Sequence, residues 1–116
     1  MSLSDPRDLE RLDAMLDAAE RIARYVDGLS KEQFLAREIT FDAVCLNLVR
    51  VGEGANFLTD RTKAQLPSIP WPDVVMMRNR IAHGYKSLDE QIIRRTAVES
   101  VPELAQAIRD AIGPAS

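Results

Sequence analysis

The clearest structural signal in the chain is residues 5–28, DPRDLERLDAMLDAAERIARYVDG. Apolar residues recur there at steps of three and four, which predicts one amphipathic helix. Asp5 is a suitable N-cap, Pro6 fits the first helical position, and Gly28 is typical of a helix end. The expected buried stripe is Leu9, Leu12, Leu16, Ala19, Ala23 and Val26.

Two further helices are expected after this one. Residues 30–37 predict a short helix with Ser30 as its cap. Residues 40–58 predict a long helix, in which Leu46 and Val49 add a second apolar side to the main stripe. A helix that is apolar on two sides is central in a bundle or lies at a subunit interface. The main stripe of this helix is Phe41, Val44, Cys45, Leu48, Val51, Ala55 and Leu58.

The rest of the chain predicts a loop and two more helices. Residues 59–72 contain three prolines, which predicts an irregular loop. A helix from about Pro72 to Gly84 follows, and the last helix begins near Asp89. Pro102 lies inside the last apolar stripe and should kink or split it. That stripe is Ile93, Ala97, Val101, Leu104, Ile108 and Ile112.

Taken together, residues 1–116 predict one all-α domain. The length of 116 residues fits a single domain, and 46% apolar with 28% charged residues is ordinary for a globular protein. Strand-like alternation, internal repeats and low-complexity segments are absent from the sequence. The expected architecture is an up-and-down bundle of four or five helices that forms a homodimer.

The single cysteine and the N-terminal residues bear on localisation. Cys45 cannot form an internal disulfide and falls in a helical apolar stripe, so we expect a buried, reduced thiol. Residues 1–6 have neither the basic nor the apolar region of a signal peptide. No uncharged stretch approaches the ~20 apolar residues of a membrane span. We therefore expect a cytoplasmic protein that makes no contact with a membrane.

Charge is unevenly distributed along the chain. The formal net charge is −3, yet residues 78–95 contain five basic and two acidic side chains. A local basic patch can attract phosphate in an otherwise acidic protein, although a solvated surface explains the same charges. The candidate RNA-backbone patch is Arg80, Lys86, Arg94 and Arg95.

His83 is the only histidine, and this excludes several kinds of site. The metalloprotease motif H-E-x-x-H and the paired E-x-x-H motifs of di-iron bundles both need more histidines. The chain also contains no P-loop and no G-x-G-x-x-G stretch. We therefore expect neither a metal ion nor a cofactor.

The run RNRIAHGY, residues 78–85, is the one chemically distinctive segment. Asn79 and His83 lie about 40° apart on a helix and share a face, whereas Arg78 and His83 lie roughly 140° apart. Two chains related by a two-fold axis could bring together the arginine and the histidine that one helix holds apart. Histidine transfers protons near neutral pH, and a guanidinium binds phosphate. The run suits metal-free RNA cleavage with the 2′-OH as nucleophile; the plainer alternative is a surface histidine after basic residues.

The pattern Arg78-Asn79-x-x-x-His83-x-Tyr85 resembles the Arg-x4-His-x-Tyr signature of HEPN-domain ribonucleases, specifically the HepT-like toxins. The flanking stretches IPWP at 69–72 and VPEL at 101–104 are similar to that family as well. The stretch VGEGA at 51–55 is similar to the family's Gly-Glu-Ala stretch but has an additional glycine, Gly54. The resemblance extends from the first helix onward over nearly the whole chain.

This resemblance implies a bundle that dimerises so that two motifs face each other in a shared cleft. It implies a metal-independent RNA endonuclease, with tRNA among the proposed targets. Arg78 would hold the scissile phosphate, His83 would be the acid/base group, and Asn79 would support it. The resemblance further implies a toxin of a type II/VII-like toxin–antitoxin pair. A minimal nucleotidyltransferase antitoxin would silence it by adding AMP to Tyr85.

Other functions also fit the sequence. Some HEPN bundles are non-catalytic binding partners of nucleotidyltransferases, and a purely structural helical dimer is a third possibility. For Tyr85, the alternative to a modification site is a half-buried aromatic whose hydroxyl binds a neighbouring group.

Overall fold

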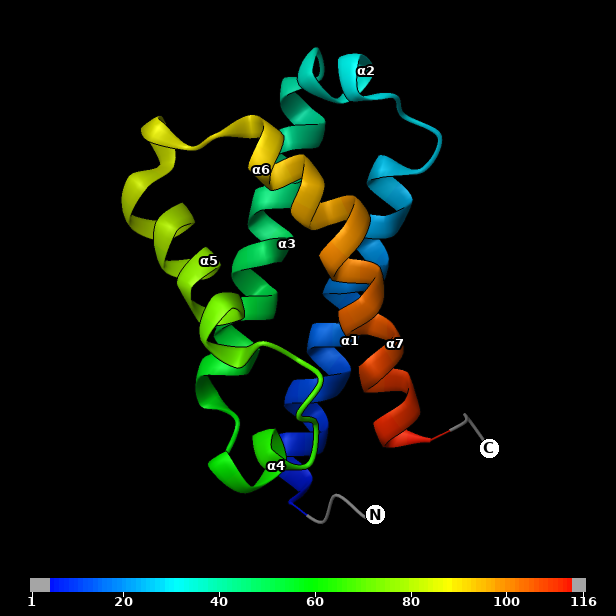
Figure 1. The fold of residues 1–116 in the computed structure, drawn as a ribbon, viewed down its shortest axis with the longest axis vertical. Helices are drawn as coiled ribbons and strands as arrows, with labels where there is room; N and C mark the ends of the chain where they lie inside the picture. Colours follow the sequence, from blue (N-terminus) through cyan, green and yellow to red (C-terminus); the bar gives the residue numbers. More distant parts are fainter. Residues whose placement is uncertain (1–4, 114–116) are drawn as a thin grey trace.

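The computed structural model describes residues 5–113, and these residues form a bundle of helices (Figure 1). The long helices are α1 (Pro6–Val26), α3 (Glu38–Phe57), α5 (Trp71–Gly84) and α7 (Val101–Ile112). The shorter elements are α2 (Lys31–Leu35), α4 (Asp60–Ala64), the 3-10 turn η1 (Tyr85–Ser87), α6 (Glu90–Arg95) and the π-helical turn η2 (Thr96–Ser100). The prediction of an all-α bundle is confirmed, and no β-strand occurs in residues 5–113. Within the same residues, no helix has the length and apolar character that crossing a membrane requires.

Helix α3 occupies the centre of the bundle. It packs against α1 on one side and α5 on the other, while α7 packs against α1 (Figure 1). The molecule measures 43 × 31 × 19 Å, and the smallest dimension corresponds to two layers of helices. Of the two positions that the sequence left open for the two-sided apolar helix, the structure shows the central one. The largest buried apolar side chains are Leu12, Met15, Ile22, Phe34, Val44, Ile93 and Ile108, and Cys45 is buried among them.

Two glycines bring α3 close to its neighbours. A Cβ atom on Gly52 would lie 2.1 Å from Cβ of Arg78 on α5. A Cβ atom on Gly54 would lie 2.4 Å from Cγ of Met15 on α1. Both distances are far inside van der Waals contact, so only a hydrogen atom fits at either position. The additional glycine of the 51–55 stretch thus has a packing role against α1.

The buried face of α1 is rotated relative to the predicted stripe. Leu9 is 37% exposed and Ala23 is also exposed, so the prediction was wrong at these two positions. The buried face passes instead through Met15 and Ile22. The rotation follows from Asp8, a polar residue that faces the interior where the sequence pattern predicts Leu9.

Asp8 is a fully buried carboxylate that joins the start of α1 to α4. Its oxygens accept hydrogen bonds from the hydroxyls of Thr59 and Thr62, both at 2.6 Å, and from the guanidinium of Arg11 at 3.2 Å. The backbone N–H of Thr59 also donates to it, at 3.3 Å. Burial by itself would raise the pKa of Asp8, but these hydrogen bonds outweigh burial and hold the pKa below its ordinary value. The ionised carboxylate therefore stabilises this end of the bundle.

The loop predicted over residues 59–72 is partly helical. Helix α4 forms within it, with the hydroxyl of Thr59 as its N-cap. Helix α5 begins at Trp71, whose indole N–H donates to two backbone carbonyls in and just after α4, at 3.1 and 3.2 Å. The prolines do not prevent these helices, because none lies inside α4 and Pro72 occupies the first turn of α5. The prediction missed α4 because the five-residue helix depends on these tertiary contacts.

The last helical run contains a π-helical turn where a kink or break was predicted. The turn η2 ends at Ser100, two residues before Pro102, which has no backbone N–H to donate. On a regular α-helix, each four-residue step advances a side chain by about 40° around the axis. A regular helix would therefore not keep Ile93, Ala97 and Val101 on one face. The wider π turn holds more residues, so all three side chains stay buried on one face. The run from α6 to α7 is therefore continuous.

We predict that Asp8→Ala destabilises the fold by about 2–4 kcal/mol, because two threonine hydroxyls and a guanidinium lose a buried acceptor. The melting temperature followed by circular dichroism should fall by about 10 °C or more. The matched control is Asp13→Ala, which removes an exposed carboxylate from the same helix and should melt like the parent. Equal melting of the two variants would contradict a stabilising role for Asp8.

The same network predicts a pH dependence. Because the pKa of Asp8 is lower in the folded state than in the unfolded chain, its contribution is fully present above about pH 4. The contribution is lost as the pH falls through the folded-state pKa. The stability difference between the parent and Asp8→Ala should therefore shrink in acid.

Candidate active site

The motif residues occupy the last turns of α5 and the start of η1. Helix α5 ends at Gly84, as the sequence predicts, and Tyr85 opens the following 3-10 turn. The motif side chains leave this helix in two directions. Asn79 and His83 line a hollow between α5 and α6, whereas Arg78 and Tyr85 contact groups on α3.

Arg78 is held by a carboxylate from the neighbouring helix. Its Nε donates to Glu53 Oε1 at 2.6 Å, and its Nη2 forms an ion pair with the same oxygen. Its Nη1 donates to Oδ1 of Asn79 at 2.9 Å. The Arg78 side chain is 27% exposed, so the guanidinium is fixed in orientation yet reaches the surface. A guanidinium has five N–H groups, which leaves donors for a further acceptor.

The hollow between α5 and α6 has a volume of about 480 Å³. Asn79 and His83 both line it, as their four-residue spacing predicts, and Arg80 lies beside them. His83 is exposed, which gives its imidazole access to solvent and to a ligand. Among residues 5–113, no hydrogen bond or ion pair links Arg78 to His83, in keeping with the predicted angle between them. The remaining lining residues are Met77, Gly84, Ser87, Leu88, Asp89, Ile92 and Ile93.

Tyr85 is directed toward the N-terminal half of α3. Its hydroxyl donates a short hydrogen bond to Oδ1 of Asp42, and its ring lies 6.3 Å from the ring of Phe41. The hydrogen bond to Asp42, with burial and nearby negative charge, raises the pKa of Tyr85 to about 12. The side chain remains 47% exposed. This geometry matches the alternative in which the hydroxyl binds a neighbouring group, and it leaves the ring within reach of a partner.

The basic residues of the predicted RNA-backbone patch are distributed over three successive elements, α5, η1 and α6. Arg80 lines the hollow, and Lys86 is exposed on η1. Arg95 forms a long ion pair with Glu99, at 3.9 Å, and Arg94 is partly buried. The structure therefore places one cation of the predicted patch directly beside His83.

Glu53 and Asp42 are site residues that sequence reasoning did not assign. Glu53 stands in the stretch that resembles the family's Gly-Glu-Ala, which was a usable signal. Asp42 has no distinguishing sequence context, and its importance follows only from the contact between α3 and η1. Within residues 5–113, no group of three or more His, Cys, Asp and Glu side chains is arranged to hold a metal ion. Burial raises the pKa of Cys45 to about 12, so this thiol stays protonated.

Comparison with known proteins places the chain in a ribonuclease class. A family model described as "HepT-like: Ribonuclease HepT-like" matches residues 15–111. The chain is 29% identical over 93 residues to "Probable ribonuclease HepT" of Thermococcus cleftensis, covering 80% of this chain and 84% of that protein. It is 25% identical over 99 residues to "Putative RNase TTE0752" of Caldanaerobacter subterraneus subsp. tengcongensis, covering 85% and 88%. No solved structure shows significant similarity to it.

The chain belongs to the HepT-like ribonuclease family. The matched region runs from α1 to α7 and includes Arg78, Asn79, His83 and Tyr85. The family resemblance inferred from the motif and its flanks is thereby confirmed.

We predict that Asp42→Asn lowers the pKa of Tyr85 from about 12 toward the ordinary value of about 10. The amide carries no negative charge and so no longer favours the protonated phenol. Tyrosinate absorbance during an alkaline titration measures the change, and subtraction of the Tyr85→Phe curve isolates Tyr85. The control Asp13→Asn, on an exposed part of α1, should titrate like the parent. Overlapping curves for Asp42→Asn and the parent would contradict the assignment.

Proposed function

We propose that this protein is an RNA endonuclease that works without a metal ion, with Arg78 and His83 as its catalytic residues. The observation that carries the proposal is the end of α5. There an exposed histidine shares a hollow with Asn79 and Arg80, and an oriented arginine stands at the neighbouring position. The family membership of the chain supports the same conclusion.

The proposed reaction uses the 2′-OH of the RNA as the nucleophile. His83 takes the 2′ proton, the 2′ oxygen bonds to the adjacent phosphorus, and the bond from phosphorus to the 5′ oxygen breaks. The protonated His83 imidazole then gives its proton to the 5′ oxygen, which leaves as a hydroxyl. The products are a 2′,3′-cyclic phosphate and a 5′-OH end. Asn79 supports the site as a polar neighbour of both Arg78 and the hollow.

Arg78 is the group proposed to hold the scissile phosphate. The guanidinium is already oriented by Glu53 and Asn79, which lowers the conformational entropy lost when a phosphate binds. Its remaining N–H groups stabilise the negative charge that builds up on the phosphate oxygens in the transition state. Arg80 and Lys86, with Arg94 and Arg95, are proposed to attract the neighbouring RNA backbone.

A homodimer is proposed because Arg78 and His83 point to different sides of α5 in one chain. A second chain across a two-fold axis would place its His83 opposite this Arg78. Helix α3 supports dimerisation, since Ile39 is 85% exposed, Leu46 52% and Phe57 58%. These three side chains share one strip of α3 with Glu53, the partner of Arg78.

The same site suggests how the enzyme is silenced. We propose that it is the toxin of a type II/VII-like toxin–antitoxin pair, and that a minimal nucleotidyltransferase transfers AMP from ATP to Tyr85. The half-exposed ring is accessible, and the hydroxyl would have to leave Asp42 to attack the α-phosphate of ATP, with pyrophosphate as the leaving group. An attached AMP adds bulk and negative charge near Arg78, which excludes RNA by steric occlusion and like-charge repulsion.

We predict that His83→Ala and Arg78→Ala each reduce cleavage of RNA, tRNA included, by a factor of about 10²–10⁴ without unfolding the protein. Cleavage by the parent should continue in EDTA and leave a 2′,3′-cyclic phosphate. Arg24→Ala, an exposed arginine at the end of α1, is the matched control and should cut like the parent. Gel assays of labelled RNA measure cleavage, and circular dichroism checks that each variant is folded.

Mixing the two inactive variants tests the shared site. If Arg78 of one chain works with His83 of the other, subunit exchange creates one intact site per mixed dimer and restores about a quarter of the parental activity. No recovery after verified exchange would refute the shared site. A folded parent with no activity on RNA would favour the non-catalytic partner of a nucleotidyltransferase.

We predict that a cognate nucleotidyltransferase with ATP adds AMP to Tyr85 and stops cleavage. Tyr85→Phe should accept no AMP and stay active in the presence of the partner, because it lacks the hydroxyl. Tyr25→Phe is the matched control and should still be modified and silenced. Mass spectrometry that locates AMP on Tyr25, or on no tyrosine, would refute the regulation and leave the nuclease proposal standing.

A further inference from the structure

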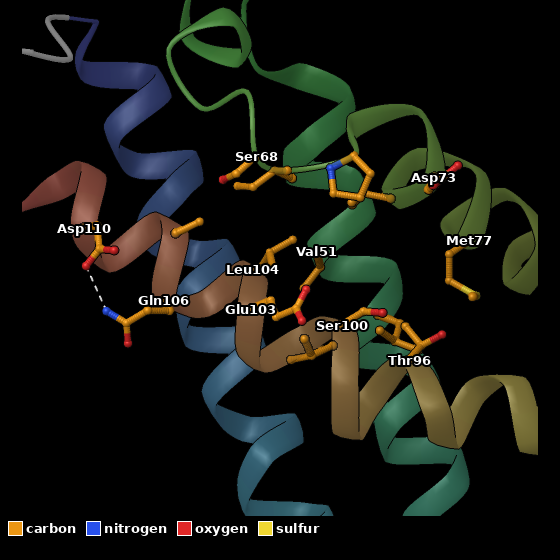
Figure 2. A pocket seen from close by; sticks show the side chains of 16 residues that line it. Val51, Ser68, Asp73, Met77, Thr96, Ser100, Glu103, Leu104, Gln106 and Asp110 are labelled. Carbon is orange, nitrogen blue, oxygen red and sulfur yellow. Dashed lines mark hydrogen bonds between the residues drawn. The ribbon is translucent and has the colours of Figure 1, made fainter.

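A second hollow adjoins the one lined by His83, with which it shares Met77, but it is otherwise built from different residues. It is a groove between α5 and the run from η2 to α7, floored by Leu48 and Val51 of α3 (Figure 2). Its volume is about 550 Å³. The groove exists because α5 packs on α3 and α7 packs on α1, while α5 and α7 form no extensive contact in the described chain. Among the described residues, Met77 alone lines both hollows.

The floor and inner walls of the groove are apolar. Val74 and Met77 of α5 remain partly exposed, as does Ala107 of α7. Partly exposed apolar side chains that line one groove can mark an interaction site. Ala107 has a small side chain and so leaves space along the α7 side of the groove. Leu104 lies about one helical turn before it.

The rim of the groove carries charge of one sign. Asp73 stands on the α5 side, and Glu103 and Asp110 stand on the α7 side, as Figure 2 shows. None of the described residues that line the groove is Lys or Arg. An RNA phosphate would be repelled by this rim, whereas a cationic ligand would be attracted.

The shape of the groove selects among cationic ligands. On the α7 wall, the lining residues recur at helical steps from Ser100 to Asp110, which corresponds to roughly 15 Å. A long, open, apolar groove between two helices is the kind of surface that receives an amphipathic helix. In residues 5–113, none of the side chains that line the groove is an aromatic of the kind that binds polyproline segments.

We propose that this groove docks an amphipathic helix of a partner protein, with an apolar face directed at α3 and Lys or Arg beside that face. The basic side chains would pair with Asp73 on one wall and with Glu103 on the other. Docking would cover the partly exposed side chains of Val74, Met77 and Ala107 above the buried floor. The site is separate from Arg78 and His83, so the inference does not depend on the nuclease proposal.

Two labelled peptides of about 14 residues provide the test. Both carry the same Leu/Ala face, one with Lys and the other with Glu along its flanks. We expect the Lys peptide to bind with an affinity that falls with salt, and at least tenfold more tightly than the Glu peptide. Asp73→Asn with Glu103→Gln should weaken the Lys peptide roughly three- to tenfold and reduce its salt dependence. The matched control, Glu10→Gln with Asp13→Asn, changes exposed residues of α1 and should bind like the parent.

A filled groove gives an independent readout. Ala107→Trp should abolish peptide binding while RNA binding and any cleavage stay at the parental level. Equal binding of the two peptides, or no effect of the charge-neutral double variant, would overturn the proposal. If Ala107→Trp instead lowers the oligomeric state and neither peptide binds, the groove is an interface between copies of this chain and the proposed partner is wrong.

Discussion

Helix α3 lies between α1 and α5 because two of its residues have no side chain. Gly52 admits the backbone of α5 at Arg78, and Gly54 admits Met15 of α1. The two glycines are separated by Glu53, so the residue between two close helix contacts is the one that binds the Arg78 guanidinium. Helix packing and the orientation of the candidate catalytic arginine therefore have the same origin.

The fold could be predicted from the sequence where its signals are local. The apolar pattern of residues 40–58 indicated a helix that is either central or at a subunit interface, and the caps of the first two helices were predicted correctly. The rotation of α1 could not be predicted, because the hydrogen bonds that bury Asp8 come from Thr59 and Thr62, more than 50 residues away. The same contacts explain why the sequence predicts a loop where α4 forms.

In the candidate site, too, local features could be predicted from the sequence and contacts between helices could not. The four-residue spacing of Asn79 and His83 was enough to predict that they share one face of a helix, and both side chains line the same hollow in the structure. The carboxylates Glu53 and Asp42 come from another helix, and a pattern within α5 carries no information about them. The basic segment was visible as charge, but its division between α5 and α6 depends on the turn at Gly84.

The ion pair between Arg78 and Glu53 has a consequence for how RNA would reach the site. A guanidinium beside a carboxylate has little net charge at a distance, so Arg78 exerts almost no long-range pull on a polyanion. The long-range attraction of RNA must then come from cations outside this ion pair. Arg80 is such a cation and lines the same hollow as His83. In the proposed enzyme, raising the salt concentration should slow encounter far more than the chemical step. Arg78 would then bind only a phosphate that other cations have already brought into contact with it.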